Sequence, residues 1–297
     1  MRLTVWAPDG IGEIAAGTDL GAVLADAIAD HLHNGDIVVV TSKIVSKAEG
    51  RFAAEEDYEQ VLAAETVEVV AHRPGVRIVR NRQGITQAAA GLDRSNVPGG
   101  AVLLLPADPD ASARAIRATL TERSGRRIGV VISDTAGRAW REGQTDHAIG
   151  SAHVLDIDDH AGRVDPHGNP LAVTAIAVAD ELAAAADLVK GKLSGRPVAV
   201  VRGRPDLVTD EPGGVRGLYR DPARDLFGHG TREAVLVAVL TALGRRAEYR
   251  DLVLLDHHEV VRRVEEWAPP GEGPALARVL IAAGYPPVEP GREPGQA

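Results

Sequence analysis

The chain has 297 residues, of which 44% are hydrophobic but only 3% aromatic, and it carries a net charge of −9 and no Cys. This composition excludes disulfides, thiolate metal sites and a Cys nucleophile, and it disfavours nucleic acid and anionic membranes as partners. The first residues lack the basic and apolar regions of a signal peptide, and no apolar run approaches the length of a membrane span. We therefore expect a cytoplasmic protein.

Four short apolar runs, rich in Val, Ile and Leu, predict buried strands. A short buried helix is the alternative for each run, because periodicity alone does not separate the two. The runs are Asp36–Thr41, Ala101–Leu105, Ile128–Ser133 and Pro197–Arg202.

Helical patterns lie between and after these runs. Thr18 or Asp19 can cap a helix that ends near Gly35, and Asp110 can cap a helix over 111–123. Strands that alternate with helices predict a mixed α/β or α+β core. Further helical patterns cover 179–193, 231–243, 251–268 and 274–283.

The end of the chain differs in character from the rest. We place the catalytic unit at 1–248 and a helical extension at 249–297. Residues 285–297 are rich in Pro and Gly and are predicted to be disordered.

The familiar phosphate and metal motifs are missing. The sequence contains no G-x-x-x-x-G-K-[ST], no H-E-x-x-H and no G-x-S-x-G, and Gly10-x-Gly12 lacks the third glycine of a dinucleotide turn. The 10 His form no cluster with metal-ligand spacing.

Polar residues instead gather at the ends of the predicted strands. The stretch 41–47 (TSKIVSK) offers hydroxyls and two cations to a phosphate chain, or it is an ordinary turn with solvated lysines. Asp93 and Asn96 lie in a polar turn, where the carboxylate could hold a hard cation and the amide could contact a base or sugar. Both residues also favour Asx-turns for local reasons.

The strongest cluster is 133–146 (SDTAGRAWREGQTD), which follows an apolar strand. An Asp and a Thr hydroxyl suit Mg²⁺ or Mn²⁺, and two Arg three residues apart suit a carboxylate or phosphate; a purely structural network is the alternative. A fourth cluster comprises Lys190-Gly191-Lys192, Arg202-Gly203 and the loop 210–216, which could close over a metal nucleotide or could be a mobile surface loop.

Open α/β sheets bind ligands at the carboxyl ends of their strands, and all four clusters lie at the ends of predicted strands. Their chemistry agrees as well, since it combines oxygen ligands for a metal, cations for phosphate and further Arg side chains for a second anion. The pattern indicates a metal–nucleotide enzyme that acts on an acid.

At these residues the sequence resembles the coenzyme F420-0:L-glutamate ligase family. The similar stretches are 35–51, 81–97, 132–150, 165–203 and 224–234. The resemblance implies a homodimeric enzyme with a mixed α+β fold that uses GTP and two divalent metal ions, Mg²⁺ or Mn²⁺. It implies that L-glutamate is joined through a γ-glutamyl amide to a deazaflavin precursor.

The resemblance also implies roles for individual residues. Asp93, Asp134 and Thr135 match the metal ligands, and Glu211 is a candidate for a further ligand. The nucleotide contacts match Ile11, Gly12, Glu13, Ile14, Ser42, Lys47 and Asn96.

Two features depart from the family pattern. Many relatives have Pro in the N-terminal segment where this chain has Gly12, which loosens a turn. Many actinobacterial relatives continue into a flavin-binding, nitroreductase-like domain, for which the residues after the ligase part are too few. We therefore expect no flavin.

The expected mechanism activates the acceptor carboxylate as an acyl phosphate, which releases GDP, before the glutamate amine attacks. Arg138 and Arg141 are our candidates for gripping an anionic substrate, on the basis of their chemistry alone. Two alternatives remain: a γ-glutamyl ligase for another acceptor, such as a folate-like pterin, and a non-catalytic nucleotide-binding regulator.

Overall fold

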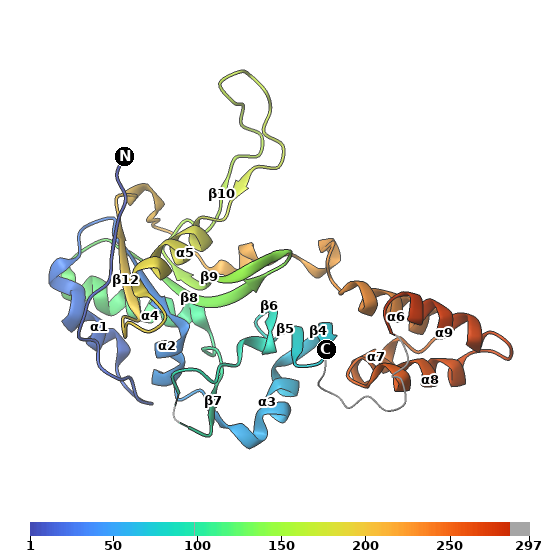
Figure 1. The fold of residues 1–297 in the computed structure, drawn as a ribbon. Coiled ribbons are helices and arrows are strands. Elements are labelled where there is room, and N and C mark those ends of the chain that lie inside the picture. The colour runs from blue at the N-terminus through green and yellow to red at the C-terminus, as the bar shows by residue number, and fades with distance from the viewer. Residues whose placement is uncertain (98, 286–297) are drawn as a thin grey trace. The chain divides into compact units, whose positions relative to one another are not determined.

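The computed structural model describes residues 1–97 and 99–285 (Figure 1). Helices and several sheets are mixed along the chain, which confirms the expected α+β fold class. The contacts divide the chain into two compact units, with residues 1–59 and 91–220 in unit 1 and residues 60–90 and 221–297 in unit 2. The boundary predicted at residue 248, between the catalytic unit and the helical extension, falls inside unit 2. The contacts do not test how far the catalytic part extends, and that boundary remains a prediction.

A five-stranded sheet forms the centre of unit 1. Its strand order is β1-β12-β2-β8-β9, with β2 and β8 parallel and every other neighbouring pair antiparallel. The strands are β1 (Thr4–Trp6), β2 (Ile37–Thr41), β8 (Gly129–Arg138), β9 (Arg141–Ala152) and β12 (Val198–Arg202).

Helices cover both faces of this sheet. Helix α5 (Val178–Lys190) packs on the face that carries Val39, Val131 and Ala199. The side chains that alternate with these point to the other face, where α4 (Pro109–Ser124) packs on β8 and β9 and α1 (Leu20–Ile28) packs on α4. The core of unit 1 therefore lies on both sides of β2 and β8.

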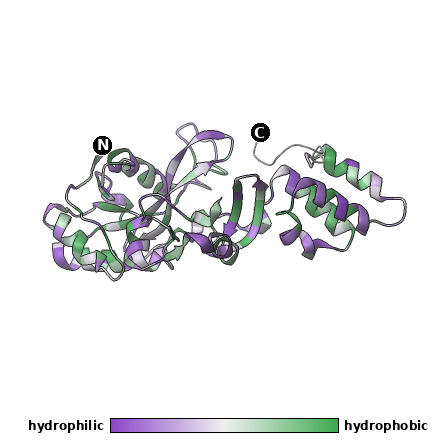
Figure 2. Ribbon diagram, turned by 60° about the horizontal axis from the view of Figure 1, so that its bottom comes forward, coloured by the Kyte–Doolittle hydropathy of each residue, from purple (hydrophilic) through white to green (hydrophobic). Residues whose placement is uncertain are grey.

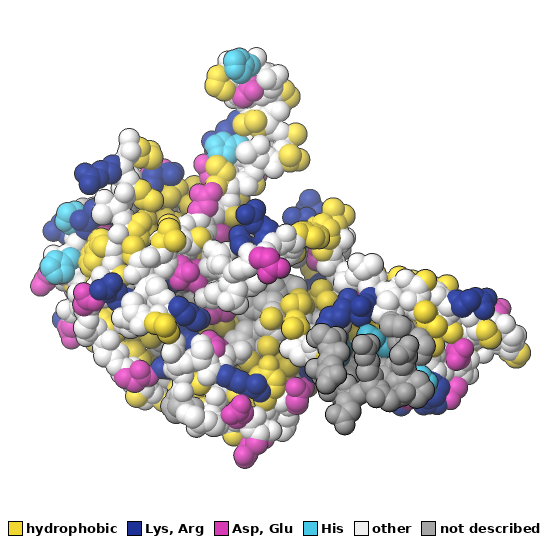
Figure 3. Space-filling model, viewed as in Figure 1, with side chains coloured by type: hydrophobic (Ala, Val, Ile, Leu, Met, Phe, Trp, Pro, Cys, Tyr) yellow, Lys and Arg dark blue, Asp and Glu magenta, His cyan; other side chains and the backbone are white. Residues whose placement is uncertain are grey.

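Smaller elements complete unit 1. Strands β3 (Phe52–Ala54) and β7 (Ala101–Leu103) pair with each other, and α2 (Ser42–Ala48) follows β2 directly. A hairpin that contains β10 (Asp158–Asp159) and β11 (Ala175–Ile176) stands out from the body of the unit (Figures 1 and 3).

Unit 2 combines one small sheet with a group of helices. Its strands are β4 (Thr66–Arg73), β5 (Val76–Asn81) and β6 (Thr86–Ala88), and α3 (Tyr58–Glu65) leads into them from unit 1. Figure 2 shows hydrophobic and hydrophilic residues alternating along the helices, as expected where each helix buries one face. These helices are α6 (Thr231–Ala242), α7 (Tyr249–Leu252), α8 (His257–Trp267) and α9 (Gly273–Ala282).

The four predicted strands are confirmed as β2, β7, β8 and β12, and the predicted helices fall on α1, α4, α5, α6, α8 and α9. Asp19 caps α1 as expected, but α4 begins two residues earlier than predicted, because Asp108 accepts from the Ala111 N–H and Pro109 occupies the first turn. The pattern over 251–268 is broken, since Asp256 caps a separate helix, α8.

Three sequence interpretations need correction in the local structure. The stretch 42–48 is a helix rather than a turn, and β8 continues through Asp134 and Thr135 to Arg138 before the chain returns as β9. Tyr285 is buried rather than part of a disordered tail. The rest of that predicted tail, 286–297, lies outside the described residues. In the described part of the chain, no helix is long and apolar enough to cross a membrane.

Candidate functional site

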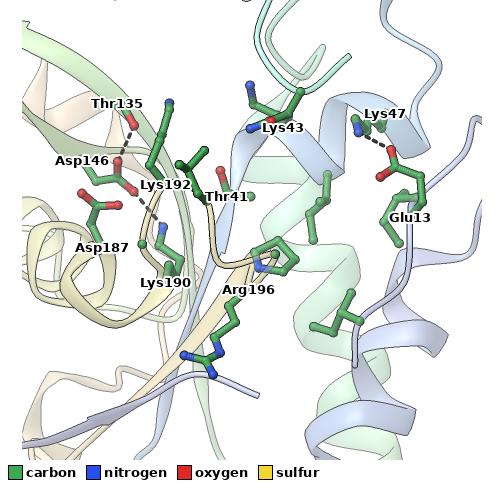
Figure 4. A pocket seen from close by; sticks show the side chains of 18 of the residues that line it. Glu13, Thr41, Lys43, Lys47, Thr135, Asp146, Asp187, Lys190, Lys192 and Arg196 are labelled. Atoms are coloured by element: carbon green, nitrogen blue, oxygen red, sulfur yellow. Dashed lines mark hydrogen bonds and ion pairs between the residues drawn. The ribbon is translucent and has the colours of Figure 1, made fainter. Parts of the chain in front are cut away.

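A cavity of about 380 Å³ lies within unit 1, at the edge of the sheet where β2 ends (Figure 4). Five of its lining side chains are Lys or Arg and three are Asp or Glu, so cations predominate locally in a chain of net charge −9. Such a cavity suits a polyanionic ligand. The lining residues are Ile11, Gly12, Glu13, Ile14, Thr41, Lys43, Ile44, Lys47, Asn96, Thr135, Asp146, Asp187, Lys190, Gly191, Lys192, Leu193, Gly195, Arg196 and Pro197.

The parallel pairing of β2 with β8 explains why two distant polar segments meet here. Thr41 is the register partner of Ser133, so the residues that follow each of them emerge side by side. The Ser42 hydroxyl donates a hydrogen bond to Asp134 Oδ1 at 2.7 Å. A predicted nucleotide contact and a predicted metal ligand are thereby joined.

Helix α2 contains two lysines, one turn apart, and each of them pairs with an acidic side chain. Lys43 Nζ pairs with the Asp93 carboxylate and also donates to the Ser95 carbonyl oxygen at 2.6 Å. The buried Lys47 pairs with Glu13, whose side chain is mostly exposed. Residues i and i+4 share one side of a helix, which is why both ammonium groups reach this end of the sheet. Both lysines line the cavity.

A buried network lies on the β8–β9 side of the cavity. Asp146 Oδ1 accepts from the Thr135 hydroxyl at 2.7 Å, and Asp146 Oδ2 accepts from Lys190 Nζ at 2.7 Å and from the Ser133 hydroxyl at 2.8 Å. Lys190 Nζ also donates to Ser133 Oγ at 2.8 Å. Figure 4 shows Lys190 and Thr135 approaching Asp146 from different sides.

The carboxylates of the site differ in their proton affinity. Burial raises the pKa of Asp134 to about 6, and the nearby charges of Asp146 and Asp93 act in the same direction. Burial alone would also raise the pKa of Asp93 and Asp146, but hydrogen bonds and the charge of Lys43 or Lys190 hold both below the ordinary value. Asp134 is therefore the carboxyl whose ionised form a nearby cation would stabilise most.

The donor set fits a hard divalent cation. Asp93, Asp134 and Thr135 offer two carboxylates and a hydroxyl, which are ligands that Mg²⁺ and Mn²⁺ prefer. Within the described residues no group of three or more His, Cys, Asp and Glu forms a metal cage.

Most of the predicted nucleotide contacts come together. Ile11–Ile14, Lys47 and Asn96 line the cavity together with the predicted metal ligand Thr135. Ser42 is not among the lining residues, but it donates to Asp134, the residue before Thr135 in β8.

The predicted ligand Glu211 is not brought to this edge. The chain around it hydrogen-bonds to His153, just beyond the end of β9, and Asp210 pairs with Arg127, just before β8 begins. Five residues of strand, about 16 Å, separate Gly129 from Asp134. The reason is the direction of β12, which runs antiparallel to β2, so that residues after β12 lie at the opposite edge of the sheet.

The two candidate arginines lie at the tip of the β8–β9 hairpin. Arg138 and Arg141 are register partners beside the turn, and Arg138 Nη2 donates to the Glu142 carbonyl oxygen at 2.7 Å. Neither residue lines the cavity. Their distance along β8 from Thr135 is about 10 Å.

Sequence reasoning assigned no role to several of the lining residues. Lys190 and Lys192 belong to a singled-out cluster and Asp146 to the strongest one, so composition did signal them. Asp187 had no such signal, because it lies within the helix α5. Arg196 had none either, because only the antiparallel pairing of β12 with β2 places the loop 191–197 at this edge.

Comparison with known proteins places the chain in a family. Residues 10–203 match the model of the family described as F420-0:Gamma-glutamyl ligase, a stretch that contains every residue lining the cavity but not Glu211. The chain is 36% identical to the coenzyme F420:L-glutamate ligase of Methanothermobacter thermautotrophicus, over 76% of this chain and 99% of that relative. It is 35% identical to the enzyme of that name from Archaeoglobus fulgidus, over 76% and 97%, and 38% identical to that from Haloarcula marismortui, over 78% and 98%. The chain therefore belongs to the F420-0:gamma-glutamyl ligase family.

Proposed function

We propose that this chain is a GTP- and metal-dependent ligase that joins L-glutamate to the coenzyme F420 precursor F420-0 through a γ-glutamyl amide. The names of the relatives support the reaction, since they are coenzyme F420:L-glutamate ligases. The observation that carries the proposal is the shared cavity, in which Ile11–Ile14, Lys47, Asn96 and Thr135 lie together. We also expect a homodimer, which sedimentation can test.

The residues of the cavity and of its immediate surroundings divide between the nucleotide and the metals. The ammonium groups of Lys43, Lys47 and Lys192 supply positive charge for a triphosphate. Asp93, Asp134 and Thr135 would hold divalent ions, which neutralise charge on the phosphate oxygens when bound. The segment Ile11–Ile14 would contact the rest of the nucleotide.

The proposed reaction has two steps. An oxygen of the acceptor carboxylate attacks the γ-phosphorus of GTP, and the bond from that phosphorus to the β–γ bridging oxygen breaks, giving an acyl phosphate and GDP. The glutamate amine then attacks the acyl carbon, inorganic phosphate leaves, and the nitrogen loses a proton. Lys47 would compensate phosphate charge in the first step.

Arg138 and Arg141 would meet the anionic groups of the acceptor or of glutamate. Their guanidinium groups stand on the same hairpin in which Thr135 pairs with Asp146, so the hairpin would connect substrate binding with the metal site. Planar guanidinium forks suit carboxylate and phosphate groups.

The test is the mass of the product after incubation with GTP, Mn²⁺, L-glutamate and F420-0. We expect the acceptor to gain one glutamyl residue, with GDP and phosphate released only when the acceptor is present. Asp134→Asn protein is the matched control. Turnover with a folate-like pterin and none with F420-0 would favour the alternative acceptor, and GTP binding without turnover of any acid would favour a regulator.

A further inference from the structure

Four polar side chains form a closed group beside the cavity, called here the Asp146 network: Ser133, Thr135, Asp146 and Lys190. Ser133, Asp146 and Lys190 are each less than 5% exposed, while Thr135 lines the cavity. Every contact within the network is 2.7 or 2.8 Å. Buried polar groups that satisfy one another in this way have fixed orientations.

The register of β8 and β9 builds this network. Thr135 and Asp146 are directly opposite each other, and Ser133 lies two residues back on the same face of β8. Asp146 can therefore reach both hydroxyls at once. Lys190 ends α5, which packs on the same strands, and its ammonium reaches Asp146 Oδ2.

The network determines which way the Thr135 hydroxyl points its hydrogen. An ionised carboxylate only accepts hydrogen bonds, so the contact between Thr135 Oγ1 and Asp146 Oδ1 must use the threonine hydrogen. The lone pairs of Thr135 Oγ1 are then left for the cavity. Lys190 and Ser133 occupy the other carboxylate oxygen, which keeps Asp146 from rotating away from Thr135.

We propose that Asp146 is a positioning residue, which orients Thr135 Oγ1 as a neutral oxygen ligand for a divalent cation bound with the nucleotide, and that Lys190 holds Asp146 in place. This inference rests on the proposed function of the cavity. It differs from a direct ligand role for Asp146, because the carboxylate is engaged on both oxygens.

The substitution Asp146→Asn would reverse the direction of the hydrogen bond between residue 146 and the Thr135 hydroxyl. Lys190 and Ser133 both donate toward one side of residue 146, so that side must keep the amide oxygen. The amide NH₂ would then face Thr135 and donate to it. The threonine hydrogen would turn toward the cavity, where it would repel a cation.

The experiment measures Mn²⁺ binding in the presence of GDP, from the paramagnetic resonance signal of free Mn²⁺, without any turnover. We expect Asp146→Asn to weaken Mn²⁺ binding by about 10- to 100-fold, as loss of a residue that orients a metal ligand commonly does. Thr135→Val removes the ligand itself and should weaken the binding at least as much. The double variant should bind no more weakly than Thr135→Val alone. Asp180→Asn is the matched control, since Asp180 accepts from the Ala148 N–H of the same strand but lies outside the cavity lining.

The outcomes separate this inference from the proposed function. Absence of Mn²⁺ binding by the wild-type protein would overturn both. Normal binding by Asp146→Asn, or fully additive losses in the double variant, would overturn the positioning role alone. If Asp146→Asn does not fold, Lys190→Gln serves in its place. We expect Lys190→Gln to weaken Mn²⁺ binding several-fold in the wild-type background and to have no effect in the Thr135→Val background. An unchanged Mn²⁺ affinity of Lys190→Gln would overturn the positioning role.

Discussion

The Ser42 hydroxyl donates to Asp134 Oδ1 across 92 positions of sequence. This one contact joins the start of α2 to the middle of β8, and it exists because β2 and β8 run in parallel next to each other. It leaves Asp134 with a neutral donor rather than a cation, so the carboxylate remains available to a metal ion.

The first prediction concerns Asp134→Asn, which preserves size and the bond from Ser42 but removes a charged metal ligand. We expect ligase turnover to fall about 100-fold or more, as when charge stabilisation is lost at other sites. Turnover at saturating Mn²⁺ and GTP is the measurement. Activity within threefold of the wild type, with unchanged Mn²⁺ affinity, would remove Asp134 from the site.

The same substitution should stabilise the metal-free protein in a pH-dependent way. The pKa of Asp134 is raised to about 6 in the folded state, so its ionisation makes stability fall as pH rises from 3.8 through 6. At higher pH the loss is at most about 3 kcal/mol, since one pKa unit corresponds to about 1.4 kcal/mol. With chelator present, Asp134→Asn should melt several degrees above the wild type at pH 8 and at the same temperature near pH 4. Equal melting temperatures at pH 8 would contradict the buried-charge account.

Much of the site could be predicted because its residues follow apolar runs. The runs that form β2 and β8 are rich in Val and Ile, which favours a strand over the alternative of a short buried helix, and the parallel pairing of these strands brings Ser42 and Asp134 to one edge. The Asp146 network could not be predicted, because β9 begins with the polar stretch REGQTDH, which has no apolar alternation. Its contacts depend on a register that only the folded hairpin defines.

The expectation that Glu211 is a metal ligand shows a different limit of prediction from sequence. Composition marks the loop 210–216 as polar and Gly-rich, but it does not give the direction of the preceding strand. Since β12 is antiparallel to β2, the loop before it reaches the cavity and the loop after it does not. Strand direction depends on long-range pairing, so local sequence does not determine it.

Lys47→Gln should weaken GTP binding with a smaller effect on the KM for glutamate. Lys47 is buried, its ammonium lines the cavity, and a charged hydrogen bond contributes about 1.5–3 kcal/mol. We expect the KM for GTP to rise about 10- to 100-fold. Arg123→Gln is the control, because Arg123 makes an exposed ion pair with Asp26. Equal shifts in the KM for GTP and glutamate would argue against a phosphate contact.

In unit 2, Tyr285→Phe should leave stability unchanged or raise it slightly, whereas Tyr285→Ala should cost about 3 kcal/mol. The ring is buried and lies edge-on to His257, but among the described residues its hydroxyl has no hydrogen-bond partner. Removing an unsatisfied buried hydroxyl relieves a desolvation penalty, while removing the ring leaves a cavity. Thermal melting of the two variants tests this, and a large loss in Tyr285→Phe would reveal a partner for the hydroxyl.

The last prediction concerns the chemistry of activation. If the acceptor carboxylate attacks the γ-phosphorus, nucleotide cleavage should give GDP and phosphate and should require the acceptor. The motivation is the residue set, since Asp93, Asp134, Thr135 and Lys47 suit a metal-bridged β,γ-phosphate. With ¹⁸O in the acceptor carboxylate, one label should pass into inorganic phosphate, because the oxygen that attacked phosphorus leaves with it when the amine displaces the acyl phosphate. Release of pyrophosphate with label in GMP would instead show adenylate-type activation of the acid. Label that stays in the acid, with GTP cleaved equally in the absence of acceptor, would show that water rather than the carboxylate attacks phosphorus.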